Sequence, residues 1–333
     1  MTHTSKIAII GLALILVGPC LFGSARQQKR DRNYNDDSLL SAGVGSTEFY
    51  RWDIKSLDTT KIYNLRILSN GAFKVRAGID TTGMAALKIS GSGQYSASQF
   101  KRIVDTLKNF KGDRKLYFID LREESHCFAN GYPISWFIPQ NEANAGFTLK
   151  EVNKDQKKRF LPLKGKELTA YNKLSGEKAG EDCIKVNIKD IMFEKELVEK
   201  AGCGYLHIPC TDHLWPEPRD IDAFMDFYKS IDPDKVWLHF HCVAGMGRTG
   251  AFMCLYDMLQ NPGVSYEDIS RRQSALGANS LMVTFRNPAK PNPKGEYTER
   301  ISRLLYRYVQ ENRASGYKRS WSDWLAENDK EAL

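Results

Sequence analysis

The chain has 333 residues, of which 42% are hydrophobic and 26% are charged. This is an ordinary globular balance with ample material for a hydrophobic core. The formal net charge of +8 favours an anionic partner such as a polyphosphate, a nucleic acid or an acidic membrane surface. No aromatic-basic repeat or nucleic-acid motif accompanies this charge, so we do not expect a nucleic-acid partner.

Residues 1–25 differ in kind from the rest of the chain. The apolar run Ile7–Val17 is too short to span a bilayer comfortably, and Gly23-Ser24-Ala25 supplies small residues for cleavage. This pattern predicts a secretory signal peptide cut near Ala25, with no stable membrane span afterwards and a secreted or periplasmic location. An uncleaved anchor, or a lipid anchor at Cys20, is the alternative, although Pro19 departs from the small residue usual before a lipidated cysteine.

The next segments predict a leader and the start of a folded domain. Residues 26–46 are polar and charged and are predicted to form a flexible leader, while 47–333 form the domain. Short apolar stretches broken by Gly and Asn predict its first strands, at Phe49–Trp52, Ile62–Leu68 and Ala72–Val75.

Strands and helices then alternate along the domain. Ser98 opens a predicted helix with one apolar face, and Lys115–Leu121 predicts a strand that delivers Asp120 to its carboxyl end, where sites form in open α/β sheets. Residues 139–192 are polar, lysine-rich and weakly patterned. Further helices are predicted at Glu194–Ala201, Ile221–Ile231, Thr298–Asn312 and Ser320–Asn328, and a further strand at Tyr205–Ile208.

The most informative stretch is His241–Gly250, a turn between two apolar segments. The run Val236–Phe240 predicts a buried strand. The segment Thr249–Gln260 is apolar almost all round and predicts a helix packed on several sides. The turn between them carries one thiol, several small residues and one arginine.

Each part of this turn suits the binding of a phosphate and attack on it. Small residues let successive backbone N–H groups close around an anion, and the helix beginning near Thr249 aims its positive end at the same point. In that field Cys242 favours the nucleophilic thiolate, and Arg248 can hold two phosphate oxygens side by side. Thr249 can cap the turn or hydrogen-bond the sulfur as it leaves. A buried structural cysteine is the alternative, and the flanking strand and helix count against it.

The cysteines outside this turn indicate no framework of their own. Six cysteines lie beyond residue 25, and their spacing shows no disulfide or zinc pattern. Cys210 is a candidate for oxidative pairing with Cys242, although a plain buried thiol is the simpler interpretation.

This turn resembles the signature loop of the cysteine-dependent protein tyrosine phosphatase (PTP) superfamily. More narrowly, the chain resembles the bacterial PTP-like phytases, which hydrolyse myo-inositol polyphosphates. The likeness covers most of the chain beyond about Tyr63. Its marks are Asp120–His126 with Asn130-Gly131 and Ser135-Trp136, Thr211–Pro216, Trp237–Cys242 and Tyr306–Arg313. Several separated matches in the same order are more specific than the loop alone.

The resemblance implies a fold and a reaction. The fold is α/β, a PTP-like core sheet flanked by helices, with a small β-rich accessory domain drawn from about 47–75 and 139–192. The reaction is hydrolysis of inositol polyphosphate monoesters through a phosphocysteine intermediate, without metal or other cofactor. The loop residues expected to bind the transferring phosphate are Val243, Ala244, Gly245, Met246, Gly247 and Thr249. A tyrosine or phosphoinositide phosphatase and a non-catalytic phosphate-binding module stay as alternatives, and the oligomeric state is not indicated.

The general acid is predicted to be Asp212. An inositol alkoxide is a poor leaving group and needs a proton. The run Thr211-Asp212-His213 matches the phytase form of the acid-bearing loop, although an aspartate in a Pro-bounded turn can also be structural. His241 is expected to hold the loop shape by hydrogen bonding.

Outer substrate contacts are matched by the same resemblance. They are His213, Asp120, Arg66, Lys173 and Lys294, with Arg300 as a second match in the C-terminal segment. The basic excess between Arg286 and Arg319 is by itself typical of a solvated face.

Overall fold

The computed structural model describes residues 49–54, 60–68, 75–138, 143–171, 174–175, 178–179, 183–283 and 291–329. All of them belong to one compact unit. The predicted signal peptide and leader, most of the expected strand at Ala72–Val75, and Lys173 lie outside the described residues. Among the helices that the structure describes, none is both long and apolar enough to cross a membrane.

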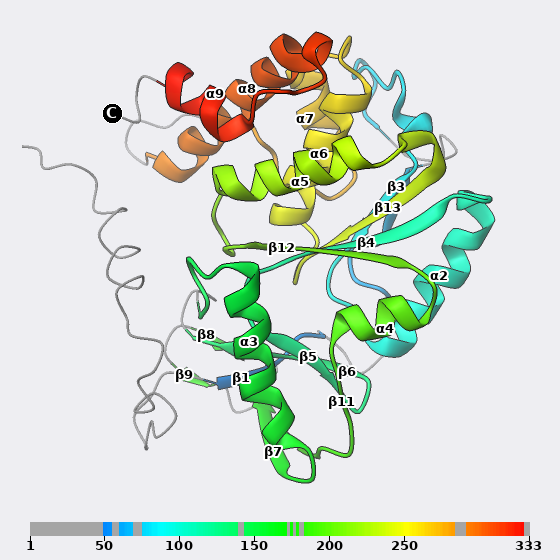
Figure 1. Cartoon of the computed structure of the whole chain (residues 1–333), viewed down its shortest axis with the longest axis vertical. Helices are drawn as coiled ribbons and strands as arrows, with labels where there is room; N and C mark the ends of the chain where they lie inside the picture. The colour runs from blue at the N-terminus through cyan, green and yellow to red at the C-terminus, as the bar shows by residue number, and fades with distance from the viewer. Residues whose placement is uncertain are drawn as a thin grey trace, which may run out of the picture. The chain divides into compact units, whose positions relative to one another are not determined.

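A five-stranded sheet forms the centre of the fold (Figure 1). Its strands in spatial order are β12 (Gly204–Cys210), β4 (Lys115–Arg122), β13 (Val236–His241), β3 (Ile89–Ser92) and β2 (Arg66–Leu68). The first four are parallel and β2 is antiparallel to β3. Every residue of β13 is buried, as a continuous apolar strand must be when helices cover both faces of its sheet.

Helices cover both faces of this sheet (Figure 1). One face carries α5 (Pro218–Ser230), α6 (Gly247–Gln260), α7 (Tyr266–Ala275), α8 (Pro293–Asn312) and α9 (Trp321–Asn328). The other carries α2 (Ala97–Lys111) and α4 (Glu194–Lys200). Short 3₁₀ turns lie at Met84–Ala86, Leu161–Leu163, Pro233–Lys235 and Arg313–Ser315. The predicted PTP-like α/β core flanked by helices is confirmed.

Capping residues set the helix starts. Ser96 and Gln99 form a capping box at α2, which fixes its first turn. Helix α8 begins at Pro293, earlier than the expected Thr298, because the side chain of Asn292 caps it by accepting the N–H of Gly295 at 3.0 Å.

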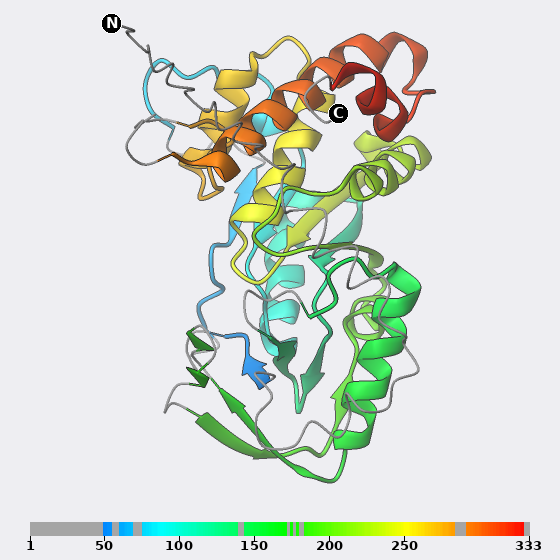
Figure 2. The same ribbon diagram turned by 90° about the vertical axis from the view of Figure 1, so that its left-hand side faces the viewer.

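A six-stranded sheet forms the second layer of the molecule (Figure 2). Its spatial order is β10 (Cys183–Asn187), β7 (Glu167–Tyr171), β1 (Phe49–Trp52), β6 (Tyr132–Phe137), β5 (His126–Ala129) and β11 (Ile191–Met192). Strands β8 (Leu174–Ser175) and β9 (Lys178–Ala179) form a separate pair.

This second sheet differs from the accessory portion expected at 47–75 and 139–192. The sheet also contains β5 and β6, which lie outside those ranges. Of the expected strand Ile62–Leu68, only Arg66–Leu68 forms a strand, β2, and it belongs to the core sheet. Helix α3 (Leu149–Phe160) also lies inside 139–192. Its capping box starts at Thr148, a local signal that the lysine-rich composition obscured.

Candidate active site

The loop Cys242–Arg248, called here the Cys242 loop, joins β13 to α6 at the carboxyl edge of the core sheet. The carbonyl groups of Val243, Gly245 and Met246 are hydrogen-bonded to residues outside the loop. The bonds run from Gln94 N to Val243 O (2.9 Å), from Arg66 Nη1 (2.7 Å) and Asn64 Nδ2 (3.1 Å) to Gly245 O, and from Asn279 N to Met246 O (3.1 Å). With these carbonyls bonded to residues outside the loop, the loop can turn N–H groups inward, the arrangement that cradles an anion.

Gly245 is the tightest point of the loop. Its φ is 70°, and a Cβ atom there would lie 2.4 Å from the backbone nitrogen of Gly93. Only glycine fits both conditions. Its N–H donates to Sγ of Cys242 at 3.2 Å, so the amide of Gly245 faces the sulfur.

Cys242 and Thr249 lie at the floor of the loop. Cys242 is 3% exposed and Thr249 is fully buried. Among the described residues, the Thr249 hydroxyl has no hydrogen-bond partner, so it is available to the sulfur or to a bound anion. Cys242 and the five other cysteines that the structure describes are all free, and Cys210 is completely buried.

Arg248 is fixed by a buried carboxylate that the sequence reasoning missed. Its Nη1 and Nη2 donate to the two oxygens of Glu124 at 2.7 and 3.1 Å, and Nη1 also donates to the carbonyl of Cys210 at 3.1 Å. Burial raises the pKa of Glu124, but Arg248 and Arg122 outweigh it and hold that pKa well below its ordinary value. The Arg248 side chain is therefore aimed before any ligand arrives.

A sequence signal for Glu124 exists in hindsight. It lies just past the carboxyl end of β4, in the run Asp120-Leu-Arg-Glu-Glu, in which only Asp120 was expected to be a site residue. Parallel strands bring their carboxyl ends to one edge of a sheet, so a carboxylate after β4 can meet an arginine after β13.

Asp212 also lies beside Arg248. Its Oδ1 is 3.1 Å from Nη2 of Arg248, and the Asp212 side chain is 19% exposed. The backbone N–H of His213 donates to the same oxygen at 2.9 Å, and His213 has a φ of 60°. The structure therefore brings Cys242, Arg248 and Asp212 to one site, with the His213 ring 66% exposed at its edge.

Two residues matched to outer substrate contacts lie instead inside the protein. Asp120 is fully buried, so in this conformation it does not form the pocket edge expected of it. Arg66 is 7% exposed, and its Nη1 supports the Gly245 carbonyl. Both were matched by motif position, and they lie on β2 and β4 of the core sheet, where the position in a motif does not reveal which side chains are buried.

The C-terminal matches lie on the surface. Lys294 is exposed in the first turn of α8. Arg300 forms an ion pair with Asp329 and lies over the ring of Tyr297 at 5.5 Å, so its guanidinium is engaged within its own segment. Lys294 as a substrate contact stays a prediction.

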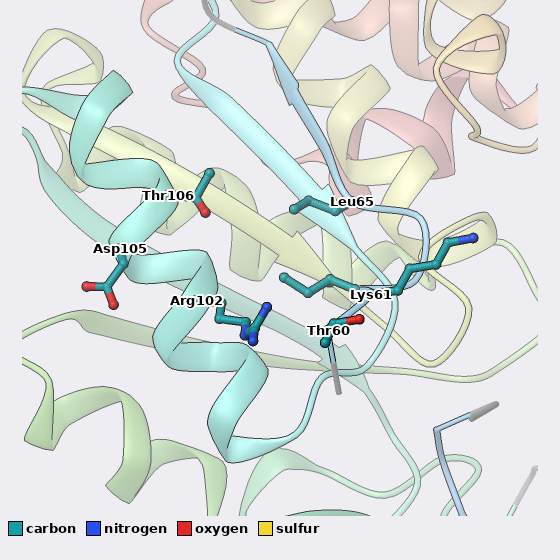
Figure 3. A pocket seen from close by; sticks show the side chains of 7 residues that line it. Thr60, Lys61, Leu65, Arg102, Asp105 and Thr106 are labelled. Carbon is teal, nitrogen blue, oxygen red and sulfur yellow. The ribbon is translucent and has the colours of Figure 1, made fainter. Parts of the chain in front are cut away.

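An open hollow of about 490 Å³ lies between α2 and the segment before β2 (Figure 3). It is lined by Thr60, Lys61, Ile62, Leu65, Arg102, Asp105 and Thr106. No residue of the Cys242 loop lines it. The hollow is therefore separate from the candidate site at the Cys242 loop.

Comparison with known proteins agrees with this geometry. The sequence model of the PTP-like phytase family, whose description reads 'Inositol hexakisphosphate', matches residues 119–260 of this chain. The tandemly repeated PTP-like phytase from Mitsuokella multacida is 35% identical, with a TM-score of 0.76, over 84% of this chain and 49% of that one. The PTP-like myo-inositol phosphatase of the same organism, solved with myo-inositol-(1,3,4,5)-tetrakisphosphate, is 31% identical, with a TM-score of 0.75, over 92% of this chain and 54% of that one.

A curated relative is the effector protein HopD2 of Pseudomonas syringae pv. tomato. It is 29% identical over 263 residues, which are 78% of this chain and 55% of HopD2. The chain therefore spans about half the length of HopD2 and of both Mitsuokella chains. The fold, the Cys242 loop and these matches place the chain in the PTP-like phytase family.

Proposed function

We propose that the protein hydrolyses phosphomonoesters of myo-inositol polyphosphates through a phosphocysteine intermediate. The observation that carries the proposal is the meeting of Cys242, Arg248 and Asp212 at one loop with carbonyls bonded to residues outside it. Family membership and the inositol tetrakisphosphate bound by the Mitsuokella relative support the substrate class.

The steps follow from the positions of these groups. The Cys242 thiolate attacks phosphorus, an S–P bond forms, and the bond from phosphorus to the inositol oxygen breaks. Asp212 gives its proton to the leaving oxygen. Water then attacks the phosphocysteine, Asp212 takes a proton from that water, and breaking of the S–P bond releases phosphate and the thiolate. Loop amides and Arg248 stabilise the charge on the transferring group in both steps.

Asp212 must exchange partners for this chemistry. In the structure the Asp212 carboxylate contacts Arg248, the side chain that would bind the phosphate. A bound phosphate would replace Asp212 as the anion that pairs with Arg248. Substrate binding therefore frees the Asp212 carboxylate to carry a proton to the leaving group.

Export stands beside the reaction as a separate proposal. We infer from the apolar run Ile7–Val17 and the small residues before Arg26 that the chain is exported after cleavage near Ala25. Expression of the full chain followed by N-terminal sequencing of the extracellular or periplasmic product tests it. An intact N-terminus on cell-retained protein would reject export.

The reaction is tested by variants and substrates together. Purified protein is incubated with inositol hexakisphosphate and chelator, and phosphate release is compared with release from a phosphotyrosyl peptide. Cys242→Ser is expected to abolish turnover while substrate binding stays measurable, because a hydroxyl is far less acidic than a thiol.

Asp212→Asn is expected to lower turnover of inositol phosphates by about 10²–10⁴-fold. The variant should lower turnover of an aryl phosphate with a good leaving group much less, because that leaving group needs no proton. Wild-type turnover by Cys242→Ser, or a preference for the peptide, would reject the proposal.

A further inference from the structure

The outward face of α3 is formed largely by lysines, and the reaction proposed above uses none of them. In Figure 1 this helix lies in front of the strands of the second sheet. Lys150, Lys154 and Lys157 are exposed and recur at the spacing that puts side chains on one side of a helix, and the exposed Lys158 borders them. Leu161 continues this spacing at the end of the helix and is 51% exposed. These five residues are called here the lysine face.

The two acidic residues of α3 both serve the folding of the helix. Asp155 is 5% exposed, and its carboxylate accepts from the hydroxyl of Ser125 at 2.5 Å and from Nε of Arg159 at 2.7 Å. Glu151 accepts the backbone N–H and the hydroxyl of Thr148, both at 2.7 Å, as part of the capping box. The outward face of α3 therefore carries more positive than negative charge.

The order of charges along α3 differs from that along α4. In α4 the charges alternate at a spacing of four residues, as in the pair of Lys195 and Glu199. In α3 the residues at this spacing are Lys150, Lys154 and Lys158, and like charges so placed destabilise a helix. The helix macrodipole favours Lys158 near the carboxyl end but disfavours Lys150 in the first turn. Helix stability therefore does not account for the lysine face, whereas an anionic partner would relieve its repulsion.

The basic surface continues beyond the end of α3. The turn Leu161–Leu163 follows the helix directly, and Lys164 and Lys166 come next, both exposed. Lys164 lies 3.7 Å from Asp190, a contact between two exposed side chains that is weak in water. An exposed apolar turn thus has Lys157 and Lys158 before it and two further lysines after it.

This combination favours a lipid surface over another polyanion. Clustered lysines are attracted to an anionic bilayer, and the interface of the bilayer accepts an apolar side chain between them. Leu161 is such a side chain. A single-stranded nucleic acid would also use aromatic rings for base stacking, and among the described residues of α3 and of the turn after it no aromatic side chain is exposed.

We propose that the lysine face of α3, together with the turn Leu161–Leu163, docks the protein on an anionic phospholipid bilayer. The lysines contact the headgroups, and Leu161 enters the interface. This docking is peripheral and needs no membrane-spanning segment. It is independent of the reaction proposed above, because Cys242, Arg248 and Asp212 all lie outside α3.

Binding is measured by flotation of the full-length protein with vesicles of equal parts phosphatidylcholine and phosphatidylglycerol, and with vesicles of phosphatidylcholine alone. All variants share the apolar run Ile7–Val17, and the neutral vesicles measure any binding through it. The double variant Lys157→Gln/Lys166→Gln removes one lysine on each side of the turn. Its matched control, Lys195→Gln/Lys200→Gln, removes the same net charge from exposed positions of α4.

A second pair of variants tests the apolar contact. Leu161→Ser removes the side chain expected to enter the interface. Leu149→Ser is its matched control, because Leu149 is 39% exposed at the other end of α3 and points about 100° away from the adjacent Lys150. Circular dichroism and thermal unfolding verify the fold of every variant, and phosphate release from a soluble substrate should stay at the wild-type rate.

We expect the double lysine variant to lower the partition coefficient on anionic vesicles about 25-fold, because each lysine near such a surface contributes about a fivefold factor. Leu161→Ser should lower it about fivefold, as expected for a leucine that is only partly buried before docking. Both controls should stay within about twofold of wild type, and added salt should weaken the binding of wild type.

Failure of the wild-type protein to float with anionic vesicles would overturn the proposal. Equal losses in the double lysine variant and its α4 control would also overturn it, because they would indicate attraction by net charge alone. If the double lysine variant does not fold, wild-type binding by Leu161→Ser overturns the lipid surface as the partner. Duplex DNA is the last probe: binding to it that depends on Lys157 and Lys166, without binding to vesicles, would assign the lysine face to a nucleic acid instead.

Discussion

At the scale of single residues, Glu124 joins two arginines. It accepts from Nε of Arg122 at 2.9 Å and from both terminal nitrogens of Arg248, and it is fully buried. One side chain therefore sets the direction of the Arg248 guanidinium and ties it to the end of β4. Such a bidentate pair fixes geometry more firmly than a single contact does.

The variant Glu124→Gln tests this role. Breaking a buried ion pair by neutralising one partner costs about 3–5 kcal/mol, so we expect a free energy of unfolding lower by that order and a marked fall in kcat/KM. Urea unfolding and steady-state kinetics measure the two effects. Glu267→Gln is the matched control, because its pair with Arg303 is exposed and should contribute less than about 1 kcal/mol. Equal effects of the two variants would contradict the role of Glu124.

Glu123, the neighbouring residue, behaves in the opposite way. It is 1% exposed, its Oε1 accepts the N–H of Gly146 at 2.9 Å, and its Oε2 has no hydrogen-bond partner among the described residues. Burial raises the pKa of Glu123 to about 8, from an ordinary value of 4.5. The folded protein therefore holds this proton over a pH range in which the unfolded chain has lost it.

The sign of the pH dependence follows from that difference. Between pH 4.5 and about 8 the folded state binds more protons at Glu123, so stability falls as pH rises through this window. The slope for one proton is about 1.4 kcal/mol per pH unit. We expect Glu123→Gln to flatten this part of the profile and to be more stable than wild type at pH 8, with little difference at pH 4.5. Denaturant unfolding across this range measures it, and parallel profiles would show that Glu123 does not titrate there.

At the scale of elements, the Cys242 loop is held by segments from outside its own strand and helix. Asn64 and Arg66 bond the carbonyl of Gly245 from the side of β2, and Gly93, just after β3, leaves room for the turn. The order β13-β3-β2 in the sheet makes this support possible. The loop conformation therefore depends on residues far away in the sequence.

Replacement of one glycine tests how tightly the loop is packed. In Gly245→Ala the new Cβ would meet the backbone at 2.4 Å in a left-handed conformation, and such strain alone costs about 1–3 kcal/mol. We expect turnover to fall by at least about tenfold, since 1.36 kcal/mol in the barrier is a factor of ten. Gly263→Ala is the control, because its Cβ would lie in open space and its φ is not in the left-handed region. The rate of phosphate release by both variants tests this prediction. Wild-type turnover by Gly245→Ala would show that the loop can relax around the new side chain.

At the scale of the whole molecule, Asp53 connects the two sheets. It follows β1 of the six-stranded sheet and pairs with Arg122 of the core sheet at 2.9 Å, with both side chains fully buried. Ser135 of β6 donates to its other oxygen at 2.7 Å. Although burial raises the pKa of Asp53, Arg122 and its other partners lower it overall. The contact continues through Arg122 and Glu124 to the active site.

Asp53→Asn is expected to destabilise the protein by about 3–5 kcal/mol, because it leaves the buried Arg122 without part of its charge balance. Urea unfolding near neutral pH measures the loss. The difference from wild type should shrink as pH falls below the ordinary carboxyl pKa of 3.8 and through the lowered folded value, because wild-type Asp53 then also becomes neutral. Asp113→Asn, at an exposed position, should stay within about 0.5 kcal/mol of wild type. If Asp53→Asn lowered the free energy of unfolding no more than the control does, the Asp53–Arg122 pair would not contribute to the stability of the contact between the two sheets.

The sequence by itself determined the elements whose signals are local. The strand at Val236–Phe240 and the helix after Thr249 are apolar runs bounded by turn residues, and in the structure they are β13 and α6. The small residues of the Cys242 loop indicate a turn whose backbone amides can bind an anion, although residues elsewhere in the chain hold its conformation. The thiol and the arginine could therefore be named as a site before the fold was known.

Only the tertiary structure decided what surrounds the loop. Glu124 and Glu194 lie far from the Cys242 loop in sequence, and only parallel strands and a packed helix bring them to Arg248 and His241. The same packing placed Asp120 inside the protein rather than at the pocket edge. A sequence pattern records periodicity and local turns, whereas the partner of a buried charge is set by which strands lie side by side and which face of each is covered.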